Sequence, residues 1–118
     1  MSDILQTLFD VTPMNEVDLP HTATIEERAL AFHLANPRVY GELRRLAFIL
    51  VNRGHKRFGC KMLAEQLRWS WYERTIDVSG YKLSNTYVAF YARLLMKNEP
   101  ELVGVFETRS SPHSSPDV

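Results

Sequence analysis

Apolar residues repeat at helical spacing in the middle of the chain. One such stripe consists of five residues that lie three or four positions apart: Val39, Leu43, Leu46, Ala47 and Leu50. Before this stripe, Asn36 suits the N-cap and Pro37 suits the first helical position, where its missing N–H would have no partner. After it, Gly54 supplies the left-handed residue that often follows a last helical turn. The pattern predicts a helix over residues 37–53.

A second helix is predicted just upstream of the first. Thr24 and Glu27 have the spacing of a capping box, in which the hydroxyl and the carboxylate each accept a hydrogen bond from the other residue's backbone N–H. The helix that this box begins is expected over residues 24–35.

A third helix is predicted from Cys60 to about Trp71, after a basic connector over residues 54–59. Four residues of this helix are expected to face inward: Met62, Leu63, Leu67 and Trp71. The connector itself has room for one short extended pairing.

A fourth helix is predicted between a loop at residues 76–83 and Pro100. Either Ser84 or Asn85 caps it, and it ends near Asn98, because the residue before a proline disfavours helical geometry. Its packing stripe consists of Val88, Tyr91, Ala92 and Leu95. After the proline, residues 102–109 are expected to form a last helical turn followed by a short strand.

The chain divides into a helical domain and two terminal segments. Residues 1–22 form an acidic leader, expected to be partly ordered or docked on the domain, with apolar residues at near-helical spacing between positions 4 and 9. Residues 23–109 hold the predicted helices, and residues 110–118 have the Ser- and Pro-rich composition of a disordered tail. The predicted fold class is mainly α: a compact domain of four to five helices, winged-helix-like, with a minor β element.

Charge is strongly segregated along the chain, although the net charge is zero. Residues 36–97 contain 12 Lys or Arg against 4 Asp or Glu, a balance of +8. Residues 1–35 contain 6 acids against 1 Arg, a balance of −5, and residues 98–118 contain 4 acids against 1 Arg, a balance of −3. The domain therefore has a basic centre between two acidic flanks.

Several classes of protein are not indicated. Cys60 is the only cysteine, so no intramolecular disulfide can form, and no apolar run approaches the ~20 residues that span a bilayer. The first residues lack the features of a secretory signal, so the expected location is a reducing cytoplasm. The histidines are scattered singly and no catalytic motif is present, so we expect no metal, no cofactor and no enzyme activity. Cys60 itself is as compatible with a small buried hydrophobe as with a reactive thiol.

The basic centre favours a nucleic-acid partner, because Lys and Arg gain affinity for phosphates by releasing condensed counterions. The candidate residues surround the end of one predicted helix and the starts of the next two: Arg53, His55, Lys56, Arg57, Lys61, Lys82, Ser84, Asn85 and Arg93. At the start of the fourth helix, Ser84 and Asn85 have the short polar side chains that read base edges in a major groove. The same two residues are equally explained as helix caps, and the basic set as a solvated face around an aromatic core.

Several short patterns resemble a family of short uncharacterised proteins of bacteriophage and prophage genomes. They are Phe32-His33-x-Ala35-Asn36-Pro37-x-Val39-Tyr40, Lys61-Met62-x-x-Glu65-x-Leu67-Arg68-Trp69, Lys82-Leu83-x-Asn85-x-Tyr87, Tyr91-Ala92-Arg93-Leu94, Glu99-Pro100-Glu101-Leu102 and Phe106-Glu107-x-Arg109. The resemblance covers about residues 30–109 and implies a phage context without supplying site residues. The helix order also resembles a winged helix, whose helix-turn-helix pair would start at Cys60 and Ser84, although residues 72–83 make a much longer connection than the usual turn.

Two functions stay open at this point. The first is binding of nucleic acid, with duplex DNA as the expected ligand, by a phage or prophage protein with a regulatory role. In this interpretation the acidic leader would compete for the basic face. The second is a protein-binding module that captures a host protein or forms a homodimer through exposed Trp69, Trp71, Tyr72 or the apolar leader. Clustering of the basic residues on one face would favour the first function, and a contiguous apolar patch the second.

Overall fold

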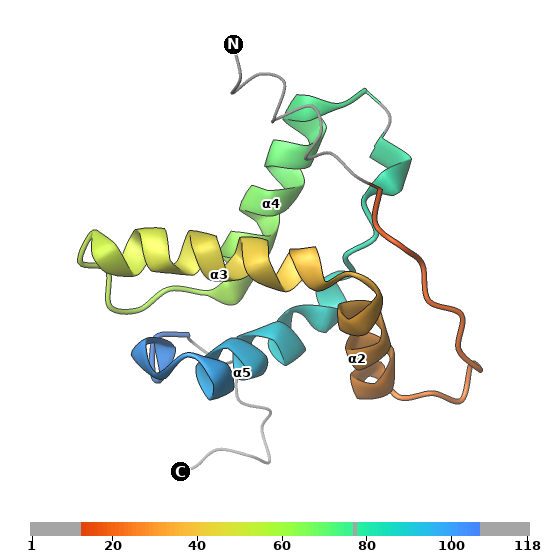
Figure 1. Cartoon of the computed structure of the whole chain (residues 1–118), viewed down its shortest axis with the longest axis horizontal. Coiled ribbons are helices and arrows are strands. Elements are labelled where there is room, and N and C mark those ends of the chain that lie inside the picture. Colours follow the sequence, from red (N-terminus) through yellow and green to blue (C-terminus); the bar gives the residue numbers. More distant parts are fainter. Residues whose placement is uncertain (1–12, 77, 107–118) are drawn as a thin grey trace.

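The computed structural model describes residues 13–76 and 78–106, which form a mainly helical fold with no β-strand among them (Figure 1). The α-helices of this part of the chain are α2 (Ile25–Ala35), α3 (Pro37–Asn52), α4 (Cys60–Arg74) and α5 (Val88–Asn98). Short 3-10 turns are η1 (Val78–Gly80), η2 (Asn85–Tyr87) and η3 (Pro100–Leu102). The prediction of a mainly α fold with helices near these positions is confirmed.

Helix α5 lies at the centre of the fold. It contacts α2, α3 and α4, and its Tyr91 and Leu95 are fully buried. In Figure 1 it runs beside α3, while α4 rises steeply across α3. The end of α5 is tied to α3 by Glu99, whose Oε2 accepts hydrogen bonds from Arg44 Nε at 2.8 Å and from Tyr40 OH at 3.2 Å. The core therefore forms around the last α-helix of the described residues.

The first two helices begin and end largely as their sequences predict. At the start of α2, Thr24 N donates to Glu27 Oε1 at 2.8 Å and Glu27 N donates to Thr24 Oγ1 at 3.0 Å, which confirms the capping box. At the end of α3, Gly54 adopts a φ of 97°, and its N–H donates to the carbonyl of Val51. Asn36 stands at the N-cap position of α3, but its side chain makes no cap hydrogen bond.

Helix α4 buries one side and exposes the other. Leu63, Leu67 and Trp71 face the core as predicted. Met62 does not, because its side chain is 51% exposed, so the prediction that it faces inward is wrong. Met62 and Leu63 differ by one position, or about 100° around a helix, and only the neighbouring helices decide which of them is covered.

The fourth predicted helix starts later than its sequence suggests. Ser84 Oγ accepts a hydrogen bond from Thr86 N at 3.2 Å, but this cap begins the 3-10 turn η2 rather than an α-helix. Helix α5 follows from Val88. The η2 turn packs on α2, where the rings of Tyr87 and Phe32 lie 5.4 Å apart.

Within residues 13–76 and 78–106, the extended pairing consists of one parallel bridge, between Phe58 and Phe106. Phe58 N donates to the carbonyl of Val105 at 3.1 Å, and the two phenyl rings meet edge to face with centroids 5.6 Å apart. The connector thus makes the one short pairing expected of it. The predicted strand does not form in residues 102–106, and residues 107–109 lie outside the described part. Neither a β-wing nor a short turn between α4 and α5 is present there, so the winged-helix arrangement and the minor β element are not confirmed.

The described part of the leader, residues 13–22, lies against the domain. Met14 N donates to the carbonyl of Gly80 at 2.8 Å, and Asn15 exchanges hydrogen bonds with Asn36. In Figure 1 this segment runs along the side where α2 lies, away from the turn between α3 and α4. The apolar positions 4–9 and the tail at residues 110–118 fall outside the described residues.

Candidate functional site

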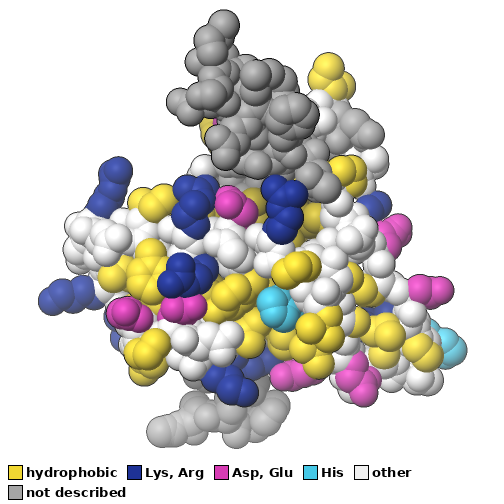
Figure 2. Space-filling model, in the orientation of Figure 1, with side chains coloured by type: hydrophobic (Ala, Val, Ile, Leu, Met, Phe, Trp, Pro, Cys, Tyr) yellow, Lys and Arg dark blue, Asp and Glu magenta, His cyan; other side chains and the backbone are white. Residues whose placement is uncertain are grey.

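Five of the nine candidate residues come together where α3 turns into α4. We call Arg53, His55, Lys56, Arg57 and Lys61 the basic corner. All five are exposed. Figure 2 shows Lys and Arg side chains projecting at the edge of the molecule where this turn lies, whereas basic and acidic side chains alternate in the middle of that face.

Backbone contacts hold both ends of the basic corner in place. On the α3 side, Arg53 N and His55 N both donate to the carbonyl of Leu50, at 3.1 Å each. On the α4 side, the buried Phe58 is fixed by its bridge to Phe106. The cations between these anchors are thus presented from a loop with a defined backbone, which reduces the entropy lost when they bind a ligand.

No acidic residue lies close to the basic corner in the sequence. No Asp or Glu occurs between Glu42 and Glu65. Among residues 13–76 and 78–106, no carboxylate forms an ion pair with Arg53, Lys56 or Lys61. Helix α4 also starts beside Lys61 without a side-chain cap, so the positive end of the helix dipole adds to the local potential.

The other four candidates lie elsewhere and have different contacts. Lys82 Nζ pairs with Glu16 of the leader at 3.6 Å, and Arg93 pairs with Glu26 of α2 at 3.3 Å. Ser84 and Asn85 belong to the η2 turn, which packs on α2. Helix α2 adjoins the start of α3, about 24 Å along that 16-residue helix from the basic corner. The structure therefore does not bring these four residues to the corner.

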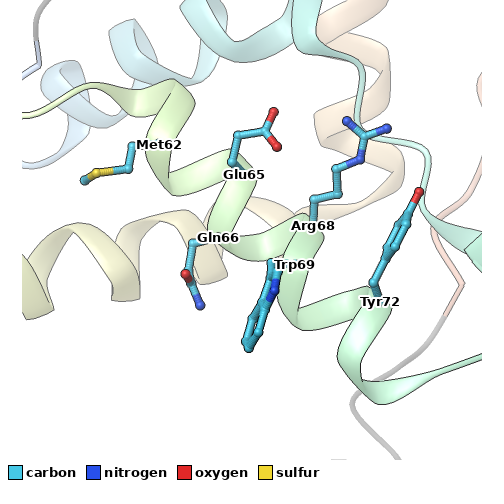
Figure 3. A pocket seen from close by; sticks show the side chains of 6 residues that line it. All are labelled: Met62, Glu65, Gln66, Arg68, Trp69 and Tyr72. Atoms are coloured by element: carbon cyan, nitrogen blue, oxygen red, sulfur yellow. The ribbon is translucent and has the colours of Figure 1, made fainter.

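A second surface, on α4, is apolar and exposed. Met62, Trp69 and Tyr72 are 51%, 60% and 50% exposed, although large apolar side chains usually avoid water. They line a shallow depression together with three polar residues (Figure 3), and we call this set the outer face of α4: Met62, Glu65, Gln66, Arg68, Trp69 and Tyr72. Of the anchors suggested by sequence, Trp69 and Tyr72 lie here, whereas Trp71 is buried. Met62 was not identified from the sequence as part of this surface, because its spacing also fits the buried stripe of the helix.

Arg68 is positioned by aromatic rings at one edge of the outer face. Its guanidinium carbon lies 6.0 Å from the centroid of the Tyr72 ring and 5.8 Å from that of Tyr81. The Tyr81 hydroxyl donates to the carbonyl of Ala64 at 3.2 Å, and burial raises the pKa of Tyr81 to about 12. The Arg68 side chain thus packs against Tyr81, which is itself hydrogen-bonded to the backbone of the same helix.

Cys60 and the histidines do not form a reactive or metal-binding cluster in the described residues. Cys60 is only 4% exposed, and burial raises the pKa of its thiol to about 12, so it is a buried apolar residue and not a reactive thiolate. Residues 13–76 and 78–106 contain no group of three or more His, Cys, Asp or Glu side chains placed to hold a metal. No helix in the same ranges has the length and apolar composition needed to cross a membrane.

Comparison of the chain with protein-family models, with curated proteins and with solved structures found no match. The resemblance to phage and prophage proteins therefore stays a prediction, and the two surfaces are interpreted from their own chemistry.

Proposed function

We propose that this protein binds nucleic acid through the basic corner, with the phosphate backbone of duplex DNA as the ligand. The observation that supports the proposal is the cluster of four Lys and Arg residues, exposed on one turn, with no acidic residue between positions 42 and 65. When Lys and Arg side chains bind the phosphates, they displace the counterions condensed on the DNA. The release of these counterions provides binding free energy that does not depend on base sequence.

The proposal is limited to contacts with the backbone. The residues predicted to read base edges, Ser84 and Asn85, lie at the start of the 3-10 turn η2, which packs on α2, and not at the start of an α-helix. Lys82 and Arg93 are each paired with a carboxylate. A regulatory role in a phage or prophage is the context in which we place this binding, on the strength of the sequence resemblance alone.

The leader is not expected to compete for the basic corner through its described residues. Glu16 pairs with Lys82, and the segment runs along the α2 side of the domain. An inhibitory contact between residues 13–22 and the corner would require this docking to be undone.

The test is fluorescence anisotropy of a labelled random-sequence duplex, titrated with the protein at about 50 and 200 mM salt. Four phosphate contacts predict a loss of affinity of roughly 100-fold between these salt concentrations. The variant Arg53→Gln/Lys56→Gln/Lys61→Gln should weaken binding and reduce the salt slope by about one for each contact removed.

A matched control removes the same charge elsewhere. Arg74→Gln/Lys82→Gln/Arg93→Gln has the same net charge as the corner variant, and Arg74 lies at the opposite end of α4 from the corner. This control should bind nearly as well as the wild type. Equal loss of affinity in both variants would show that net charge, and not the corner, drives binding. Absence of binding at the lower salt concentration would overturn the proposal.

Protein binding is the second candidate function, and one observation favours it. Three large apolar side chains on the outer face of α4 are half or more exposed and line the same shallow depression. Aromatic residues and Met are enriched at protein interfaces, where their burial provides most of the binding free energy.

A further inference from the structure

Helix α4 is apolar on two opposite sides. Its core side carries five buried residues: Cys60, Leu63, Ala64, Leu67 and Trp71. On the outer face, Met62 and Trp69 are seven residues apart, and Ile76, just beyond the helix end, lies seven residues further and is fully exposed. A seven-residue repeat of apolar side chains is the pattern by which one helix packs along another. The outer face therefore has the pattern of a helix-packing surface with no helix on it among the described residues.

Positions between these repeats complete the pattern. Glu65 and Tyr72 lie three residues after Met62 and Trp69, which makes them the second set of contact positions in each repeat. Figure 3 shows Met62 and Trp69 along one edge of this surface of the helix and Glu65 and Tyr72 along the other. A carboxylate at one of the four contact positions restricts what can be placed against this surface, because it needs a cation or a hydrogen-bond donor opposite.

We propose that a second copy of this chain covers the outer face, with the two α4 helices antiparallel and related by a twofold axis near residue 67. The inference rests on the protein-binding candidate and not on nucleic-acid binding. Reversing the helix about residue 67 exchanges Met62 with Tyr72 and Glu65 with Trp69. Met62 of each copy then lies against the Tyr72 ring of the other, and Trp69 lies opposite Glu65, to which its indole N–H can donate a hydrogen bond.

Charge selects this orientation over the parallel one. In a parallel pair, Glu65 would face Glu65 of the second copy, which is repulsive. In the antiparallel pair, Glu65 is level with Trp69 of the second copy, and Arg68 is the residue before Trp69. Glu65 and Arg68 of the second copy are therefore offset by one residue, about 1.5 Å along the helix axis. The tyrosine rings beside Arg68 hold its guanidinium on the same edge of the helix as Glu65 (Figure 3). The outer face is thus complementary to itself in both apolar contacts and charge.

The experiment measures self-association of the full chain by sedimentation velocity over a wide range of protein concentration. The wild type should change from monomer to dimer as concentration rises, with a blue shift of the Trp69 emission. Glu65→Arg and Arg68→Glu should each weaken the dimer at least tenfold, because like charges then meet near the twofold axis.

Mixing the two variants is the decisive step. The Glu65→Arg copy presents two cations and the Arg68→Glu copy presents two carboxylates, so an equimolar mixture should form a heterodimer about as stable as the wild-type dimer. Both substitutions are at exposed positions, and restored association also proves that both variants fold. A wild type that stays monomeric, or a mixture that does not associate, would overturn the proposal.

Lys56→Glu is the control for this experiment. It reverses a charge of the same kind as Arg68→Glu, but it lies in the basic corner, so it should leave dimerisation unchanged and weaken DNA binding. Dimerisation that responds equally to Lys56→Glu would contradict the assignment of the interface to the outer face. Failure of DNA binding with an intact dimer would count against the basic corner alone.

Discussion

Asn15 and Asn36 bind each other through two reciprocal hydrogen bonds. Asn15 N donates to Asn36 Oδ1 at 2.6 Å, and Asn36 Nδ2 donates to the carbonyl of Asn15 at 2.9 Å. Asn36 is 7% exposed, and its Nδ2 also donates to the carbonyl of Phe32 at 3.1 Å. One buried amide therefore satisfies backbone groups of the leader and of the α2–α3 junction, which joins the leader to the domain.

Replacing Asn36 should loosen the leader. Asn36→Ala leaves the backbone N–H and carbonyl of Asn15 without protein partners, so we expect a loss of about 1–3 kcal/mol in the free energy of unfolding. Limited proteolysis should then cut within residues 13–22 faster than in the wild type. The control is Asn15→Ala, which removes only an exposed side-chain bond to the carbonyl of Ala35 and should cost less. Equal losses for the two variants would contradict this role of Asn36.

Two glycines should respond to alanine in opposite directions. Gly41 is exposed within α3, and an added Cβ meets no atom within 4 Å, so Gly41→Ala should stabilise the protein by about 0.5–1 kcal/mol. At Gly80 the added Cβ would lie 3.0 Å from Trp71 Cζ2 and 3.1 Å from Pro13 Cα. Gly80→Ala should therefore destabilise by roughly 1–3 kcal/mol. Urea unfolding measures both changes, and a stabilising Gly80→Ala would show that the leader does not pack there.

His33 should make stability depend on pH between about 7 and 5. Burial lowers the pKa of its imidazole, which lies among the rings of Tyr40, Phe90 and Tyr91 with its Nδ1 unpaired. The unfolded chain thus takes up a proton on this group at higher pH than the folded chain. Stability is complete above the unfolded pKa of 6.5 and falls as the pH drops from there towards the folded pKa.

The measurement is the midpoint of thermal unfolding of the wild type and of His33→Phe at several pH values across this range. The variant should lose less stability on acidification. The Glu99 carboxyl does not interfere, because the hydrogen bond from Arg44 holds its pKa below the ordinary value of 4.5. Identical pH profiles for both proteins would show that His33 is not the group that titrates.

Cys60 should react with a thiol reagent only after unfolding. Because burial raises the pKa of its thiol to about 12, the native protein holds almost no thiolate at pH 8. We expect 5,5′-dithiobis(2-nitrobenzoate) to react at least roughly 100-fold more slowly with native protein than with protein in guanidinium chloride. Comparable rates in the two conditions would contradict the burial of Cys60.

Most of the helical framework follows from local sequence. The capping box at Thr24, the proline at position 37 and the glycine at position 54 fix helix ends through backbone groups only a few residues away. Such signals do not depend on the rest of the chain. These signals gave the wrong helix start at Ser84, which caps the 3-10 turn η2 and not an α-helix. A serine cap makes the same side-chain hydrogen bond at the start of a 3-10 turn and of an α-helix, so the sequence does not distinguish them.

The candidate surfaces were only partly predictable. The basic corner follows from sequence, since its residues lie between positions 53 and 61 and its cations need no distant contact to be exposed. The separation of Lys82 and Arg93 from the corner did not follow, because each pairs with a carboxylate more than 60 residues away in the chain. The outer face of α4 could not be predicted from the sequence, because the spacing of Met62 fits either side of the helix.

The sequence by itself determined the approximate positions of the helices, the capping box at Thr24 and the segregation of charge, because each depends on residues that are neighbours in the chain. Only the tertiary structure decided which side of α4 is buried and what Asn36 binds. Helical spacing tells which residues share a face, but Met62 and Leu63 are covered or exposed according to where α3 and α5 pack. Contacts between segments that are distant in the sequence therefore determine which of these two residues is buried.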